Sequence, residues 1–124
     1  MILIADIGST KGDWCLVDGD KFTSIQTLGF NPYTLSNEFL IEILKFINKK
    51  IDLNQVKKLF YYGAGCNNPK YKNLVKKILS KKLINASIFV ETDLLAACRA
   101  TCGNKSGIVS ILGTGSNSCL YDGK

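Results

Sequence analysis

Short apolar runs open the chain and then alternate with segments whose apolar residues recur at helical spacing. Residues 2–7 form an almost continuous apolar run, interrupted only by Asp6, which predicts a central strand buried on both faces. Residues 13–18 and 21–28 predict two further strands, joined by an Asp-Gly-Asp hairpin signal at 18–20. The chain is therefore expected to begin with three successive strands.

Helices and strands alternate after this opening. Apolar residues at helical spacing predict a helix over 35–47, and a second amphipathic helix follows Pro69. Thr92 is the expected N-cap of a third helix, which ends near Cys102. The strands before the second and third helices are expected at 59–62 and 87–90. The predicted order is βββαβαβα, which is typical of one compact α/β unit.

A last pair of strands is predicted near the end of the sequence. Residues 107–112 form an apolar strand, and a short strand through 119–121 follows a glycine turn at 113–115. Because unpaired strand edges attract other strands, we expect this pair to pack against the preceding elements or against a neighbouring copy. The Asp-Gly signal at 122–123 has no strand after it, from which we expect the sequence to be part of a longer protein.

Length and composition fit one core, since 124 residues with 46% hydrophobic content are too few for two full domains. No apolar run approaches the roughly 20 residues that cross a bilayer, so we expect a cytoplasmic protein with no membrane partner. The five cysteines include no Cys-x-x-Cys pair and the chain has no histidine, which argues against a zinc site. Cys98 and Cys102 fall one helical turn apart and could share a metal or oxidise, but reduced core thiols are favoured.

The net charge of +6 comes almost wholly from lysine, and Arg99 is the only arginine. A nucleic-acid-binding protein would be expected to show arginines, interleaved aromatic residues or a recognised motif, so we expect no nucleic-acid partner. A solvated lysine face explains the charge, and a nucleotide is the alternative anionic partner.

The first strand delivers a carboxylate, Asp6, to a turn that suits a phosphate. The turn consists of Gly8, Ser9, Thr10 and Lys11. Glycine lets backbone N–H groups approach an anion, the hydroxyls add donors, and a carboxylate at a strand end can hold Mg²⁺ or its waters. An ordinary strand-to-strand turn has a similar composition, so that interpretation stays open.

Two later segments add to this first turn. The Gly-Thr-Gly-Ser-Asn turn at 113–117 also follows a buried strand, and it fits neither the P-loop nor the dinucleotide pattern. Glu91 and Asp93 stand where a strand ends and a helix begins, a usual ligand position in open α/β sheets. Asp93 could be a general base, or it could only stabilise the helix dipole.

The order and spacing of these three motifs resemble those of the actin and hexokinase superfamily. Within it, residues 92–97 followed by 113–117 look like the N-acetylglucosamine kinase and BadF/BadG/BcrA/BcrD ATPase group. The resemblance covers the whole chain. It implies an α/β, ribonuclease H-like lobe over residues 1–104, with a mixed five-stranded sheet of order 3-2-1-4-5 flanked by helices. Residues 105–124 would be the opening hairpin of a second lobe.

The same resemblance implies an ATP-dependent kinase that uses Mg²⁺ and phosphorylates an amino sugar, with N-acetylglucosamine the expected substrate. Asp6 would act on Mg²⁺ through water, and Asp93 would be the base. The implied ATP contacts are Asp6, Gly8, Ser9, Thr10, Lys11, Gly113, Thr114 and Gly115. The implied sugar contacts are Asn31, Asp93, Ser116 and Asn117, with residues 63–65 lining the cleft. For Asn31, a loop asparagine that caps the following helix is an equal alternative.

Two other functions stay open within the same family. Its ATPases that activate radical dehydratases carry a cluster-binding cysteine just before the second phosphate turn, where this chain has Ile111 and Leu112. A nonenzymatic sugar sensor is the second alternative, and a homodimer is compatible with the sequence. Because the family's adenine pocket lies in the second lobe, we expect these residues alone to bind ATP weakly or not at all.

Overall fold

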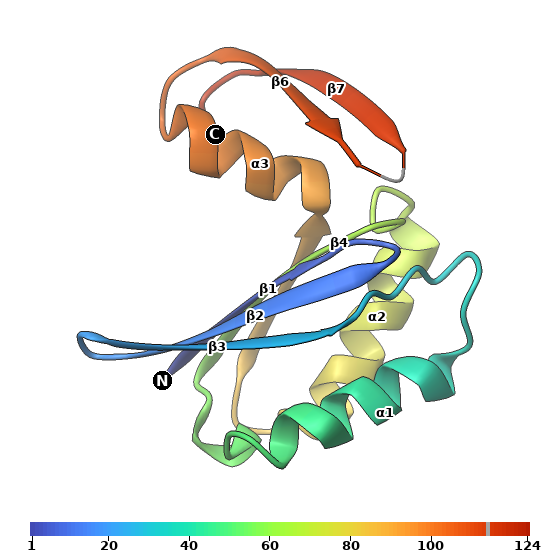
Figure 1. The fold of residues 1–124 in the computed structure, drawn as a ribbon, viewed down its shortest axis with the longest axis vertical. Coiled ribbons are helices and arrows are strands. Elements are labelled where there is room, and N and C mark those ends of the chain that lie inside the picture. The colour runs from blue at the N-terminus through green and yellow to red at the C-terminus, as the bar shows by residue number, and fades with distance from the viewer. Residues whose placement is uncertain (114) are drawn as a thin grey trace.

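One mixed sheet and a separate hairpin contain the strands of the computed structural model, which describes residues 1–113 and 115–124 (Figure 1). The sheet strands are β1 (Ile2–Ile7), β2 (Lys11–Asp18), β3 (Lys21–Leu28), β4 (Lys58–Gly63) and β5 (Ser87–Thr92). The helices are α1 (Asn37–Asn48), α2 (Pro69–Lys82) and α3 (Asp93–Cys102), and the hairpin strands are β6 (Gly107–Leu112) and β7 (Ser116–Tyr121). None of the described helices is long and apolar enough to span a membrane.

The sheet has five strands in the order β3-β2-β1-β4-β5, which confirms the predicted topology. β1 is antiparallel to β2 and parallel to β4, with Ile7 opposite Gly12 on one side and Gly63 on the other. Parallel strands need crossover connections, and α1 and α2 supply them before β4 and β5. Both crossovers run the same way across the sheet, so the right-handed rule places both helices on one face, below the sheet in Figure 1.

The sheet face covered by α1 and α2 contains the main core. Leu3, Ala5 and Ile7 of β1 are completely buried there. Trp14 of β2 is also buried in this core, and its indole Nε1 donates a hydrogen bond to Thr27 Oγ1 at 3.0 Å. Because this bond satisfies the one polar atom of the side chain, the ring is buried without leaving an unpaired N–H group.

β1 is buried on one face only, so the prediction of burial on both faces is wrong. Ile2 and Ile4 point to the opposite face and are 36% and 38% exposed. The reason is the path of α3, which leaves the end of β5 and lies above the carboxyl ends of the strands (Figure 1). The described elements leave the rest of that face open.

Local signals fixed most helix boundaries. Thr92 Oγ1 accepts a hydrogen bond from Leu95 N at 3.2 Å and so caps α3, as predicted. Asn68 does the same for α2, accepting from Lys70 N at 2.9 Å. A 3-10 helix at Leu53–Gln55 was not predicted, because three residues are too few to show a period.

The β6–β7 hairpin packs on α3 instead of joining the main sheet. A second, small core holds Cys98 of α3 with Val109 of β6 and Tyr121 of β7. The Tyr121 hydroxyl donates to the backbone oxygen of Gly103 at 3.2 Å, which ties the end of β7 to the end of α3. The hairpin therefore packs against the preceding elements, as expected from its edges. Its outer face exposes Ile108, Leu112 and Leu120.

Replacing Leu59 by alanine tests the main core. Leu59 of β4 is completely buried, so Leu59→Ala should lower the free energy of unfolding by about 2–5 kcal/mol through lost burial and a residual cavity. The matched control is Leu120→Ala, because Leu120 is 80% exposed and its truncation should change stability by less than about 0.5 kcal/mol. Urea unfolding followed by Trp14 fluorescence measures both, and equal losses would contradict the assigned core.

Candidate active site

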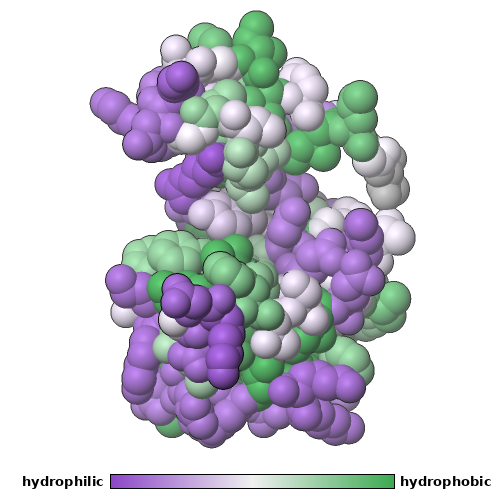
Figure 2. Space-filling view, turned by 60° about the vertical axis from the view of Figure 1, so that its left-hand side comes forward, coloured by the Kyte–Doolittle hydropathy of each residue, from purple (hydrophilic) through white to green (hydrophobic). Residues whose placement is uncertain are grey.

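A cleft of about 780 Å³ lies between the two glycine turns and the start of α3. The space-filling view shows the molecule hollowed between the overhanging hairpin and the body below it (Figure 2). The predicted site residues that line this cleft are Asp6, Gly8, Ser9, Thr10, Lys11, Asp93, Gly113, Gly115, Ser116 and Asn117. Thr114 lies outside the described residues. The structure thus brings three motifs that are far apart in sequence to one place.

The first glycine turn is the tip of the β1–β2 hairpin, and a neighbouring loop supports it. Gly8 N donates to Lys11 O at 2.9 Å within the tip. From the loop after β3, Gly29 N donates to Thr10 O at 2.9 Å and Phe30 N donates to Gly8 O at 3.0 Å. A Cβ on Gly29 would lie 2.1 Å from Gly8 O, so only glycine allows this approach. The sequence showed Gly29 merely as a loop glycine.

Asn31 supports the same tip from outside the cleft. Its side-chain Nδ2 donates to Ser9 Oγ at 3.3 Å, and its Oδ1 accepts from Tyr33 N at 3.0 Å. Its backbone oxygen accepts from Leu35 N at 2.9 Å. Asn31 therefore organises its own loop, whereas Ser36 is the N-cap of α1. Neither Asn31 nor residues 63–65 are among the residues that line the cleft.

The second glycine turn is also a hairpin tip, between β6 and β7. Gly113 N donates to Gly115 O at 2.9 Å, and Leu112 is paired with Ser116 directly below the tip. A Cβ on Gly115 would meet no atom within 4 Å, so this tip is open where the first one is tightly packed. Two hairpin tips therefore face one cleft, one fixed by the sheet and one extending from α3.

Asp93 is held at the first turn of α3. Its Oδ1 accepts a hydrogen bond from Leu94 N at 2.9 Å, and the Thr92 cap fixes the turn beside it. The helix dipole favours a carboxylate at this position, so the structural role and a chemical role are compatible. Glu91 is engaged elsewhere, because its Oε2 lies 2.8 Å from Lys72 Nζ of α2.

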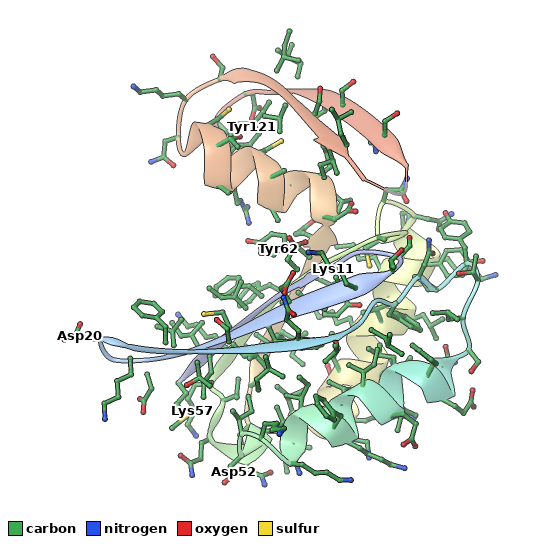
Figure 3. All side chains as sticks on the ribbon, in the orientation of Figure 1. Lys11, Asp20, Asp52, Lys57, Tyr62 and Tyr121 are labelled. Carbon is green, nitrogen blue, oxygen red and sulfur yellow. The ribbon has the colours of Figure 1, made fainter. Side chains whose placement is uncertain are left out.

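Asp13, Arg99 and Tyr62 also line the cleft, and the sequence did not mark them. Asp13 of β2 lies directly opposite Asp6 in the β1–β2 register. Arg99 Nη1 donates to the Tyr62 hydroxyl at 3.0 Å, and Figure 3 shows Tyr62 beneath α3. The bond to Tyr62 raises the pKa of Arg99. Only the strand register and the path of α3 bring these three side chains to the site.

The surroundings of Asp6 disfavour the ionised form of its carboxyl group. Its pKa is raised, mainly because the cleft walls withhold part of its hydration, although the side chain remains open to solvent. The negative charges of Asp93 and Asp13 raise the pKa further, and Lys11 partly offsets them. The Lys11 ammonium lies 3.8 Å from Asp13 Oδ2 and so faces the same group of charges.

The balance of charge in this cleft favours a cation, so an anion would need a counter-ion to bind there. Its wall carries the carboxylates of Asp6, Asp13 and Asp93 against the cations of Lys11 and Arg99. A polyphosphate would meet more negative than positive charge there, which is unfavourable without a counter-ion. Within the described part of the chain, no three acidic or cysteine side chains are grouped to bind a metal directly. The wall fits a Mg²⁺ that keeps its waters and binds through phosphate oxygens.

Comparison with known proteins identifies a relative of this chain. No family model matches it, and no curated protein matches it. A solved structure described as a "putative N-acetylglucosamine kinase" from Porphyromonas gingivalis is 41% identical over 99% of this chain, with a TM-score of 0.86. This chain is a relative of that protein. The resemblance carried by the three motifs is thereby confirmed.

Two solved structures from Pseudomonas aeruginosa share the fold alone. YeaZ has a TM-score of 0.53 at 13% identity, covering 91% of this chain and 55% of YeaZ. A protein with similarity to the peptidase YeaZ has a TM-score of 0.55 at 14% identity, covering 98% of this chain and 58% of its own. The chain has the actin-like ATPase fold, and it spans 45% of the Porphyromonas relative.

Replacing Asp6 by asparagine tests the electrostatics of the cleft. A carboxyl group with a raised folded-state pKa binds its proton more tightly folded than unfolded, so its ionisation destabilises the fold as pH rises above the ordinary 3.8. Asp6→Asn should therefore raise the Tm at pH 7, and the gain should shrink as pH falls through the raised pKa and be lost below 3.8. Asp20→Asn, at the exposed turn far from the cleft (Figure 3), is the control. A variant less stable than the parent at pH 7 would contradict this assignment.

Replacing Gly29 by alanine tests the support of the first tip. The added Cβ must push the loop away from Gly8, so Gly29→Ala should cost more than about 2 kcal/mol in the free energy of unfolding, with two backbone hydrogen bonds disturbed. Gly115→Ala is the matched control, because its Cβ meets nothing within 4 Å. Chemical denaturation measures both variants, and equal stabilities would rule out the close approach at Gly29.

Proposed function

We propose that this chain forms the phosphate-binding part of an ATP-dependent kinase that phosphorylates an amino sugar, N-acetylglucosamine. The observation that carries the proposal is the single cleft in which both glycine turns and Asp93 meet. The name of the Porphyromonas relative supports the substrate class. We expect such an enzyme in the cytoplasm, where ATP and sugars are available to it.

ATP would bind with its phosphates between the two hairpin tips. Gly8 N and Gly113 N already donate within their own turns, so these glycines would serve by letting a phosphate approach the backbone closely. Ser9 would add a hydroxyl donor, and Lys11 would add a positive charge. Thr10 and Thr114 are the further phosphate ligands that the family resemblance proposes.

Mg²⁺ bound with ATP would neutralise the phosphate charge as the terminal phosphoryl group moves. Asp6 would accept hydrogen bonds from the waters of that ion, with Asp13 across the strand pair as its neighbour. The raised pKa of Asp6 fits this role, because lost hydration and the charges of Asp93 and Asp13 outweigh the attraction of Lys11, so a nearby cation would be favourable.

Asp93 would accept the proton of the attacking sugar hydroxyl. As the hydroxyl oxygen bonds to the terminal phosphorus, the bond from that phosphorus to the bridging oxygen breaks and ADP leaves. The Leu94 amide and the Thr92 cap fix the carboxylate, which reduces the motion needed at the moment of transfer.

We assign residues 105–124 to the opening hairpin of a second lobe, because β6 and β7 form their own sheet and pack on α3 in a core separate from the main one. Ser116 and Asn117, which follow the second tip, would reach the sugar from that lobe. Asn31 would act indirectly, by holding Ser9 in place.

A substrate panel with the full-length protein separates the kinase from its two rivals. ATP turnover that rises only when N-acetylglucosamine is added supports the kinase. Sugar-independent turnover would favour an ATPase of the activator type, and sugar binding without turnover would favour a sensor.

Replacing Asp93 by asparagine tests the base. The amide cannot accept the hydroxyl proton, so sugar-dependent ATP turnover by Asp93→Asn should fall about 10²–10⁴-fold with little change in fold. The control is Glu91→Gln, two residues away, because Glu91 pairs with Lys72 and does not line the cleft. A coupled ADP assay measures both, and normal turnover in Asp93→Asn would exclude this residue as the base.

A further inference from the structure

The small core between α3 and the hairpin contains three of the five cysteines. Cys98 lies on α3 and is 1% exposed, whereas Cys102, one turn later, and Cys119 on β7 are half-buried. The sulfur atoms of Cys98 and Cys119 are 3.4 Å apart. The sequence favoured reduced core thiols, with a Cys98 and Cys102 pair as the alternative, whereas the structure places Cys98 beside Cys119 of another element.

The two sulfur atoms are in van der Waals contact, at 3.4 Å. A disulfide needs them about 1.4 Å closer, at about 2.05 Å, and rotation of two short side chains can provide that. Cys102 makes a different contact, since its sulfur accepts from Thr101 Oγ1 at 3.7 Å. A metal does not explain the cluster, because the described residues contain no group of three such side chains arranged as ligands.

We propose that Cys98 and Cys119 are a peroxide-sensitive pair that closes a disulfide between α3 and β7. The half-buried Cys119 thiol reacts first with hydrogen peroxide, giving a sulfenic acid and one water. The Cys98 sulfur then attacks the Cys119 sulfur, the S–OH bond breaks, and the Cys98 proton leaves with the hydroxyl as a second water. Two thiols lose two electrons in total and the peroxide gains them.

The pair stays reduced until an oxidant reaches it. Burial, helped by the hydrogen bond with Cys119, raises the pKa of Cys98 to about 11. Very little of the Cys98 thiol is then ionised at pH 7. Cys98 is therefore a poor first nucleophile, and its attack on an oxidised Cys119 depends on the 3.4 Å distance between the two sulfur atoms.

The bridge would join two elements that both line the cleft, α3 and the β6–β7 hairpin. α3 begins with Asp93, and β7 begins with Ser116 immediately after the second tip. A covalent link between these elements fixes the second tip relative to Asp93, beside the Tyr121 to Gly103 bond that already closes the far end. Only this consequence for the cleft rests on the proposed kinase function, and the bridge itself does not.

Peptide mapping tests the pairing directly, because trypsin separates the three cysteines. Cleavage after Lys82, Arg99 and Lys105 places Cys98 in 83–99, Cys102 in 100–105 and Cys119 in 106–124. The chain is treated with hydrogen peroxide, its free thiols are alkylated, and the digest is analysed by mass spectrometry. We expect 83–99 linked to 106–124 with the loss of two hydrogen atoms, and separation of the two by dithiothreitol. Full alkylation of Cys98, or a link of either peptide to 100–105, would overturn the proposal.

Serine variants and thermal unfolding provide a second measurement. The bridge should raise the Tm of the oxidised chain by about 5–10 °C, since it closes the loop between residues 98 and 119. Cys102→Ser should keep the linked peptide and the Tm rise, and Cys119→Ser should lose both. If Cys119→Ser fails to fold, the Tm of the unsubstituted chain still tests the proposal. An unchanged Tm after oxidation would contradict a bridge within the native fold.

Discussion

The candidate site depends on a close backbone contact between Gly29 and the β1–β2 tip, where a side chain on residue 29 would not fit. Gly29 lies so close to the β1–β2 tip that its own N–H and that of Phe30 hold the tip's carbonyl groups. Asn31 adds a side-chain bond to Ser9 from the same loop. The tip is therefore fixed by a loop that follows β3, and the loop is fixed in turn by the buried Phe30 and the start of α1. The first tip is thus anchored to the main core.

The second half of the cleft is built differently. The β6–β7 tip extends from α3 and depends on a core of few residues, so it is secured less firmly than the first tip. Cys98, Val109 and Tyr121 carry this small core. A rigid tip facing a weakly secured one is an arrangement in which a ligand or a covalent bridge can change the spacing across the cleft.

The sequence was enough to predict the helices and strands of the main sheet in their order, because most of them have an apolar run or helical spacing, whereas the short 3-10 helix was missed. Thr92 marked the start of α3, and the turn after Asp6 marked the first tip. The predicted burial of β1 on both faces failed, since no sequence pattern revealed that α3 would leave half of that face open. Asp13 and Arg99 were missed for a similar reason: the register of β2 against β1, and the path of α3, bring them to the cleft. The role of Gly29 was also missed, because a glycine in a loop does not reveal which backbone packs against it.

The central claim is that both hairpin tips and Asp93 form one phosphate site. Nuclear magnetic resonance titration of the ¹⁵N-labelled chain with magnesium ATP tests it most directly, because the method detects millimolar affinities. The account predicts that the amide signals of Ser9, Asp93 and Gly115 shift together and fit one dissociation constant. Shifts confined to the lysine-rich surface of α2, with both tips unaffected, would contradict it.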